Sequence, residues 1–210
     1  NSSGSGVVAI SSQRSVIKGN YVSGHASNGI YVVSNDSIVS NNVVSNNTLA
    51  GIYVESTTNV VINDNVVTNN GFQGIVIDTQ TNSIVSGNML SGNTTGGAYQ
   101  TIWVRNASND NIISSNIIEA PSGDSDVLIE IHSSALRNVI VGNTYISDTI
   151  TTYVSDNGTD TRYNEWDRTT ITTDDERGYN LFSISGSSSV ALASSTQLGT
   201  GDIFALNNII

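Results

Sequence analysis

The sequence GIYVVSNDSIVSNNVVSNN, which begins at Gly29, is written twice more along the chain with small changes. It returns as GIYVESTTNVVINDNVVTNN from Gly51 and as GIVIDTQTNSIVSGNMLSGN from Gly74, so the period is 22 or 23 residues. A fixed period of this length is typical of repeat proteins, in which each repeat is one supersecondary unit stacked on the next. The chain is therefore best interpreted as a stack before any single motif is considered.

Each repeat contains three short apolar runs separated by Ser, Thr, Asn and Asp. In the second copy these runs are Ile52–Val54, Val60–Ile62 and Val66–Val67. Short runs rich in Val and Ile predict strands, and about 22 residues are too few for a strand, a crossover helix and a second strand. We therefore predict an all-β fold, a parallel β-solenoid of about six coils with three strands per coil, in which equivalent strands lie about 4.8 Å apart.

An asparagine recurs after the middle strand of each predicted coil. The positions are Asn20, Asn42, Asn65, Asn88, Asn116 and Asn143. Asparagines at equivalent corners can hydrogen-bond to one another as a ladder, and asparagine tolerates the left-handed backbone conformation that a tight corner needs. The spacing follows the repeat, which favours an inward-facing ladder. The alternative is that asparagine serves here only as a turn residue.

The repeats from about Gly6 to Thr152 resemble the right-handed parallel β-helix repeat family, which includes pectate-lyase-like enzymes, phage tailspikes and other surface proteins. The resemblance is carried by the stacked Gly-Ile-Tyr-Val segments and by the recurring asparagines. It implies a right-handed coil, in line with the general preference of parallel crossovers. It implies little about activity, because this family includes lyases, hydrolases, epimerases and structural shafts.

The composition excludes several classes of partner. A net charge of −11 argues against nucleic acid, because that partner requires a basic surface. No run approaches the roughly 18 apolar residues of a membrane span, and the absence of cysteine excludes a disulfide framework. The Ser-, Thr- and Asn-rich, lysine-poor surface and the family resemblance together indicate a protein of the extracellular space, the cell surface or the virion surface.

The repeat pattern divides the chain into two parts. Residues 1–152 are predicted to form the β-helix, with longer turns at Thr94–Gln100 and Ala120–Asp126. Residues 153–210 lose the period but keep apolar runs, which predicts a C-terminal β cap or oligomerisation extension. No amphipathic helix precedes Val7 to cover the first coil. Because unpaired strand edges recruit other chains, we expect a preceding segment, self-association or a neighbouring subunit at the solenoid ends.

The first strand of each repeat is predicted to display two columns of side chains on one outer face. Side chains alternate inward and outward along a strand, and Ile52 and Val54 are assigned to the interior. The first predicted column is Tyr31, Tyr53, Val76, Trp103 and Leu128, and the second is Glu55, Asp78, Arg105 and Glu130, with His132 nearby.

These columns predict a ligand-binding face. Aromatic rings pack on the C–H surfaces of sugars, while carboxylates and arginine hydrogen-bond to hydroxyl or acidic groups. Glu55 and Asp78 are expected about 5 Å apart in adjacent coils, a spacing that suits retaining glycoside hydrolysis or calcium binding. The alternative is a structural ladder of surface ion pairs, Asp78–Arg105–Glu130.

Two classes of function remain open from the sequence. We expect a structural or recognition protein, namely a shaft, an adhesin or a self-assembling surface protein, with a polysaccharide or another glycan as an optional ligand. The alternative is a polysaccharide lyase, hydrolase or epimerase that acts on the same outer face. For such enzymes the resemblance implies either a basic residue assisted by calcium-binding carboxylates or a cluster of aspartates. Arg105 is the only candidate for the basic residue on the two columns, and they contain no cluster of aspartates. No cofactor is expected except, as an option, calcium. The acidic turns Asp156–Asp160 and Asp174–Glu176 are further candidates for it, but neither matches a full calcium-loop pattern, which favours solvated acidic loops.

Overall fold

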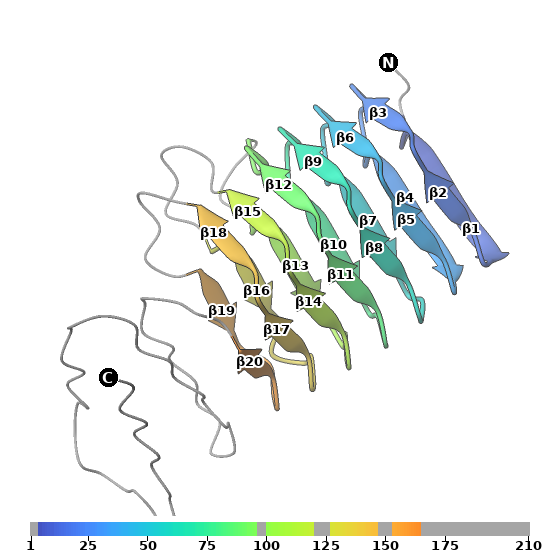
Figure 1. Cartoon of the computed structure of the whole chain (residues 1–210). Helices are drawn as coiled ribbons and strands as arrows, with labels where there is room; N and C mark the ends of the chain where they lie inside the picture. Colours follow the sequence, from blue (N-terminus) through green and yellow to red (C-terminus); the bar gives the residue numbers. More distant parts are fainter. Residues whose placement is uncertain (1–3, 96–99, 120–126, 147–152, 165–210) are drawn as a thin grey trace, which may run out of the picture.

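The computed structural model is a stack of coils and describes residues 4–95, 100–119, 127–146 and 153–164 (Figure 1). Each full coil contributes one strand to each of three parallel sheets, which confirms the predicted all-β solenoid with three strands per coil. Two sheets have seven strands and the third has six, so the described chain forms six coils and begins a seventh. The described residues contain no helix. Accordingly, no helix in these ranges is long and apolar enough to span a membrane.

The three sheets are named by the order in which a coil meets them. Sheet A contains β1 (Val7–Gln13), β4 (Ile30–Asn35), β7 (Ile52–Glu55), β10 (Ile75–Asp78), β13 (Ile102–Arg105), β16 (Ile129–Ile131) and β19 (Val154–Asp156). Sheet B contains β2 (Val16–Lys18), β5 (Ile38–Ser40), β8 (Val61–Asn63), β11 (Ile84–Ser86), β14 (Ile112–Ser114), β17 (Val139–Val141) and β20 (Arg162–Asn164). Sheet C contains β3 (Tyr21–Ser23), β6 (Val43–Ser45), β9 (Val66–Thr68), β12 (Met89–Ser91), β15 (Ile117–Glu119) and β18 (Thr144–Ile146).

The core is a set of apolar columns that run along the axis of the stack. Ile75 pairs with Ile52 on one side and with Ile102 on the other, and all three are fully buried. Sheets B and C complete a single contiguous core. In sheet B each strand from β2 to β17 contributes one apolar residue to it, and in sheet C each strand from β3 to β15 does the same. Branched side chains suit this packing because they fill a pleated, buried surface well.

A buried asparagine ladder follows sheet B, as the sequence predicts. Asn42 donates from Nδ2 and from its backbone N–H to Oδ1 of Asn65, both at 3.0 Å. The same Nδ2 donates to the Ile17 carbonyl of the preceding coil at 3.0 Å. This pattern repeats along the column from Asn20 to Asn143. Each interior asparagine therefore satisfies its acceptor and both of its donors without water.

A second asparagine ladder follows sheet C and was not predicted. Asn47 donates from Nδ2 to Asn70 Oδ1 at 2.9 Å, and Asn70 donates to Asn93 Oδ1 at 2.9 Å. All three side chains are buried. The sequence signal is weaker than that of the first ladder, because these asparagines occupy only three coils rather than six.

The corner between sheets B and C turns through a residue with positive φ. It is the residue immediately before the ladder asparagine, not that asparagine itself, which corrects the expectation that the ladder residue adopts the left-handed conformation. The positive-φ residues at this corner are Gly19, Asn41, Asp64, Gly87, Ser115 and Gly142. Five of these six are Gly, Asn or Asp, the residue types that tolerate this conformation best. The sharp turn directs the next side chain, the asparagine, into the core.

The β-helix continues past the predicted boundary at Thr152. β19 pairs with β16, and β20 pairs with β17, in the same parallel register as the earlier coils. The repeat therefore extends at least to Asn164. The remainder of the predicted C-terminal extension, residues 165–210, lies outside the described residues.

We predict that Asn65→Ala destabilises the fold by about 3 kcal/mol or more, because each buried group left without its partner costs about 1–3 kcal/mol. The groups affected belong to Asn42, Val39 and Asn88. Asn63→Ala is the matched control, since its side chain makes an exposed hydrogen bond and a surface change of this kind shifts stability by about 0.5 kcal/mol or less. Urea unfolding followed by circular dichroism measures both. Equal unfolding midpoints for the two variants would contradict the structural role of the ladder.

The glycine that opens the strands of sheet A is required by close packing rather than by its backbone conformation. A Cβ at Gly51 would lie 2.5 Å from Val67 Cγ1, 2.8 Å from Asn70 Nδ2 and 2.8 Å from the Gly74 carbonyl oxygen. The second asparagine ladder therefore occupies the space that a side chain would need.

We predict that Gly51→Ala lowers the free energy of unfolding by about 1–3 kcal/mol, the usual effect of overpacking a core. Gly4→Ala is the control, because nothing lies within 4 Å of a Cβ at that position. Thermal unfolding of the two variants tests this prediction. A Gly51→Ala protein as stable as Gly4→Ala would contradict it, because the asparagine ladder would then have moved to accommodate the methyl group at no cost in stability.

Candidate functional site

The outer face of sheet A, here called the sheet A face, carries the side chains predicted to form two columns. The first column along the axis is Tyr31, Tyr53, Val76, Trp103 and Glu130. The second column is Glu55, Asp78 and Arg105, which His132 extends directly after β16. The backbone N–H of His132 donates to the Val104 carbonyl at 2.9 Å, which fixes that extension beside Arg105.

One part of the predicted register is wrong. Leu128 and Glu130 were expected to face outward beside Trp103 and Arg105. Instead Ile129 pairs with Ile102, so Glu130 lies beside Trp103, and Leu128 is only 1% exposed. Leu128 takes the place that glycine holds in the earlier coils. The shift of two residues follows the segment 120–126 of the sequence, after which Leu128, and not a glycine, immediately precedes the strand.

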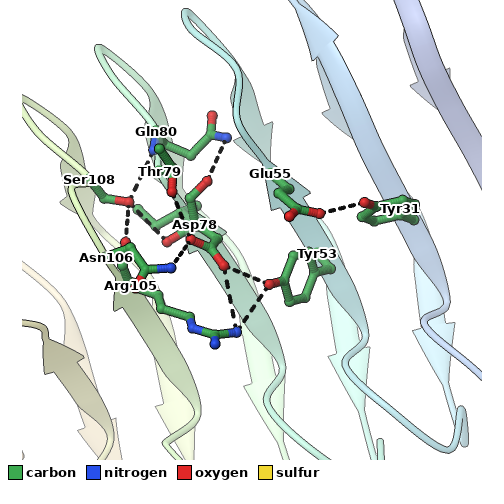
Figure 2. Close-up of polar contacts among 10 residues, drawn as sticks. Tyr31, Tyr53, Glu55, Asp78, Thr79, Gln80, Arg105, Asn106 and Ser108 are labelled. Carbon is green, nitrogen blue, oxygen red and sulfur yellow. Dashed lines mark hydrogen bonds and ion pairs between the residues drawn. The ribbon is translucent and has the colours of Figure 1, made fainter.

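Asp78 is the most enclosed carboxylate of this face, with 5% of its surface exposed. Its Oδ1 accepts hydrogen bonds from Asn106 Nδ2 at 2.6 Å and from Thr79 Oγ1 at 3.0 Å. Its Oδ2 accepts a hydrogen bond from the Tyr53 hydroxyl at 2.7 Å and lies 3.5 Å from Arg105 Nη1. Figure 2 shows these donors converging on the carboxylate. Both oxygens are therefore occupied by groups of the chain itself.

Arg105 reaches across β10 to the next strand of the sheet. From β13 its Nη1 donates to the Tyr53 hydroxyl on β7 at 3.3 Å (Figure 2). Its guanidinium carbon lies 4.8 Å from the centre of the Trp103 ring. This position over an aromatic face is a cation–π contact. Val76, which lies on β10 between Tyr53 and Trp103, is completely buried. The Arg105 side chain itself remains 40% exposed.

Glu55 makes the equivalent diagonal contact one coil earlier. The Tyr31 hydroxyl donates a short hydrogen bond to its carboxylate, and the Tyr31 and Tyr53 rings lie 5.8 Å apart with a tilt of 57°. A tyrosine in one coil thus binds an acid in the next coil twice in succession. The sequence contains this signal, because Tyr is the third residue of two Gly-Ile-Tyr-Val segments and an acid is the fifth residue of the following repeat.

Both tyrosine hydroxyls are held in the protonated form. The hydrogen bond to Glu55, followed by burial, raises the pKa of Tyr31 to about 12. Burial, followed by the hydrogen bond to Asp78, raises the pKa of Tyr53 further above its usual value. Each hydroxyl is therefore a hydrogen-bond donor to its carboxylate throughout the neutral range.

The far end of the sheet A face has its own polar contacts. Gln100 donates a short hydrogen bond to Glu130, and His132 Nδ1 lies 2.8 Å from Ser134 Oγ. The predicted Asp78–Arg105–Glu130 ladder is therefore formed only between Asp78 and Arg105. Gln100, like Thr79 and Asn106 around Asp78, was not among the predicted site residues, because its role depends on contacts between coils.

The described residues contain no group of three or more His, Cys, Asp or Glu side chains that could hold a metal ion. In the acidic turn at Asp156–Asp160, the Asp156 carboxylate accepts hydrogen bonds from the Gly158 N–H at 2.8 Å and from Thr161 at 3.3 Å. The second predicted calcium turn, Asp174–Glu176, lies outside the described residues.

Comparison with protein families identifies the repeat. A profile described as "Periplasmic copper-binding protein (NosD)" matches residues 1–181. The chain belongs to the NosD family. This is a right-handed β-helix family, so the handedness implied by the resemblance is confirmed. A search of curated protein sequences finds no significant match.

Solved structures share the fold at low identity. A DFA-IIIase from Arthrobacter chlorophenolicus A6, without its lid and in complex with GF2, has a TM-score of 0.62 and 12% identity over 82% of this chain and 52% of its own. Full-length tailspike protein 2 from Escherichia coli O157:H7 bacteriophage CAB120 has a TM-score of 0.53 and 19% identity over 62% of this chain and 17% of its own. The NosD-family chain thus spans about half or less of either structure, and the likeness is one of fold.

The residues of this chain do not fit a copper centre. Copper in proteins is bound mainly by His, Cys and Met, and the whole sequence contains two histidines, one methionine and no cysteine. His25 lies between β3 and β4, Met89 is on β12, and His132 follows β16. These positions belong to the first, fourth and sixth coils, and coils are about 4.8 Å apart. They cannot share one ion.

We predict that Glu55→Gln lowers the pKa of Tyr31 toward its ordinary value of 10.0, because the hydrogen bond to the carboxylate is the largest cause of the increase. Since the folded-state pKa is the higher one, this contact stabilises the fold fully below pH 10.0 and less as the pH rises toward about 12. The difference in tyrosinate absorbance between each protein and its Tyr31→Phe derivative measures the pKa. Glu119→Gln, on sheet C, is the control, and an equal effect of the two substitutions would contradict the contact.

Proposed function

We propose that this NosD-family chain is a recognition protein located outside the cytoplasm, in the periplasm or on a surface, and that it binds a glycan on the sheet A face. The family description and the resemblance to a tailspike fold support that location. The axis of the β-helix gives the face an elongated shape suited to a polymer. Its tyrosine rings and exposed polar groups are the two kinds of contact that sugars use.

The single observation that carries this proposal is the state of the Asp78 carboxylate. Four groups of the chain surround its two oxygens. A catalytic acid, base or calcium ligand requires an accessible oxygen, whereas a fixed carboxylate serves to position Tyr53 and Arg105. Glu55 accepts one hydrogen bond, from Tyr31, but its neighbour Asp78 is enclosed, so the pair does not offer two accessible carboxylates. The arrangement therefore favours recognition over the lyase, hydrolase or epimerase alternative, in which two carboxylates act on one sugar.

The long turns of the sequence directly precede strands of this face. Thr94–Gln100 precedes β13, which carries Trp103 and Arg105, and Ala120–Asp126 precedes β16, which carries Glu130. Insertions in a solenoid often mark its binding side. Their place in the sequence supports the sheet A face as the recognition surface, with the residues Tyr31, Tyr53, Glu55, Asp78, Trp103, Arg105, Glu130 and His132 in or around it.

The test is binding to a panel of neutral and acidic polysaccharides, with the protein immobilised through Lys18, its sole lysine, on sheet B. We predict that Trp103→Ala weakens binding by about tenfold or more, equivalent to about 1.4 kcal/mol, because Arg105 loses the ring beneath it. Tyr21→Ala is the matched control, since it removes an aromatic side chain that is 74% exposed on sheet C. Circular dichroism confirms that both variants are folded.

Two results would overturn the proposal. The first is a folded wild-type protein that binds no polysaccharide of the panel. The second is the release of shortened or unsaturated products from a bound polysaccharide that Asp78→Asn abolishes, which would establish the enzymatic alternative.

A further inference from the structure

The sheet A face has an excess of negative charge. This face carries three carboxylates, which belong to Glu55, Asp78 and Glu130. Arg105 is the single arginine or lysine among the described residues of the face. The three carboxylates and one guanidinium have a formal charge of −2. The whole chain has a net charge of −11, so the surroundings do not offset this excess.

The charge of Arg105 is already balanced within the face. Its Nη1 lies 3.5 Å from the Asp78 carboxylate, and its guanidinium lies over Trp103. An incoming carboxylate or sulfate would have to share Arg105 with Asp78, and Asp78 lies next to Glu55 of the preceding coil. Like charges in contact weaken a complex strongly.

The other described cations cannot assist an anionic polymer on this face. Arg137 is engaged by Asp110 through two hydrogen bonds of 2.7 and 2.6 Å at the corner between sheets A and B. Lys18 and Arg162 lie on sheet B, and Arg14 lies in the turn after β1. A polyanion laid along the axis therefore meets no row of positive charges among the described residues, and such a row is the feature that binds these polymers.

The groups that remain are mainly hydrogen-bond acceptors. Within the described chain, the carboxylates of Glu55 and Glu130 each accept from one side-chain donor, Tyr31 and Gln100 respectively, and a carboxylate accepts through two oxygens. The hydroxyl groups of an uncharged sugar are donors that match them, and a hydrogen bond to an ionised acceptor is stronger than a neutral one.

We propose that the glycan bound by the sheet A face is neutral: a hydroxyl-rich polysaccharide without uronate, sulfate or phosphate groups. This inference rests on the proposed function and narrows it. Glu55 and Glu130 act as acceptors for sugar hydroxyls, Arg105 and the tyrosine rings provide the remaining contacts, and the excess negative charge excludes acidic polymers.

The experiment compares polymers that differ only in charge. Pullulan, mannan, inulin and galactan are the neutral probes, and polygalacturonate, alginate and hyaluronan are the acidic ones. Each neutral polymer that binds is also oxidised at its primary hydroxyls to carboxylates. We expect oxidation to weaken binding about tenfold or more at about 0.02 M salt and less at about 0.5 M salt, because salt screens the repulsion. Binding of the unoxidised polymer should change little with salt.

A charge-reversal pair separates the local effect from the net charge of the protein. Glu130→Lys changes the formal charge of the sheet A face from −2 to 0, and we expect it to reduce the discrimination against the oxidised polymer about tenfold. Glu119→Lys makes the same change in net charge on an exposed residue of sheet C and should leave the discrimination unaltered.

The outcomes distinguish this inference from the proposed function. Equal or tighter binding of the acidic or oxidised polymers would overturn the inference while leaving glycan recognition intact. Equal effects of Glu130→Lys and Glu119→Lys would also overturn it, because discrimination would then not arise at this face. Failure of the folded protein to bind any probe would overturn both.

Discussion

The stacking of one coil on the next at the strand spacing is the constraint on which the rest of the structure depends. A polar side chain that recurs at one interior position can be satisfied by its equivalents in the coils above and below if it both donates and accepts. Asparagine meets this condition, because its amide carries an acceptor on one side and donors on the other. Asn42, Asn65 and Asn88 therefore form a continuous buried column, and the backbone corner before each of them is held in the left-handed conformation.

The same stacking creates the sheet A face. Outward side chains of successive coils lie next to one another, so a tyrosine of one coil can bind an acid of the next. Tyr53 and Arg105 approach each other over β10 and enclose Asp78 between them. The result is a fixed surface network, and a fixed network suits recognition of an extended ligand because little side-chain freedom is lost on binding.

The repeat becomes less regular after the coil in which the second asparagine ladder of the described chain ends. Up to Asn93 each ladder asparagine packs against a glycine at the start of a sheet A strand, as Asn93 does against Gly74. In the next two coils that position is held by Thr101 and Leu128, both buried. Larger side chains are accommodated there, and the long turns of the sequence directly precede these two positions. Core packing and turn length therefore change together.

The period and the alternation of Val and Ile determined the fold class, the stacking of Ile52 on Ile75 and the first asparagine ladder, because each depends on spacing along the chain. The columns from Tyr31 to Arg105 followed from the same spacing. The register of Glu130 and His132, the burial of Leu128 and the second ladder were decided by the tertiary structure. After an insertion in the repeat, the spacing along the sequence no longer predicts the register of the next strand. Contacts between coils then determine which residues lie side by side. The enclosure of Asp78 also required the structure, since Arg105 reaches Tyr53 across an intervening strand.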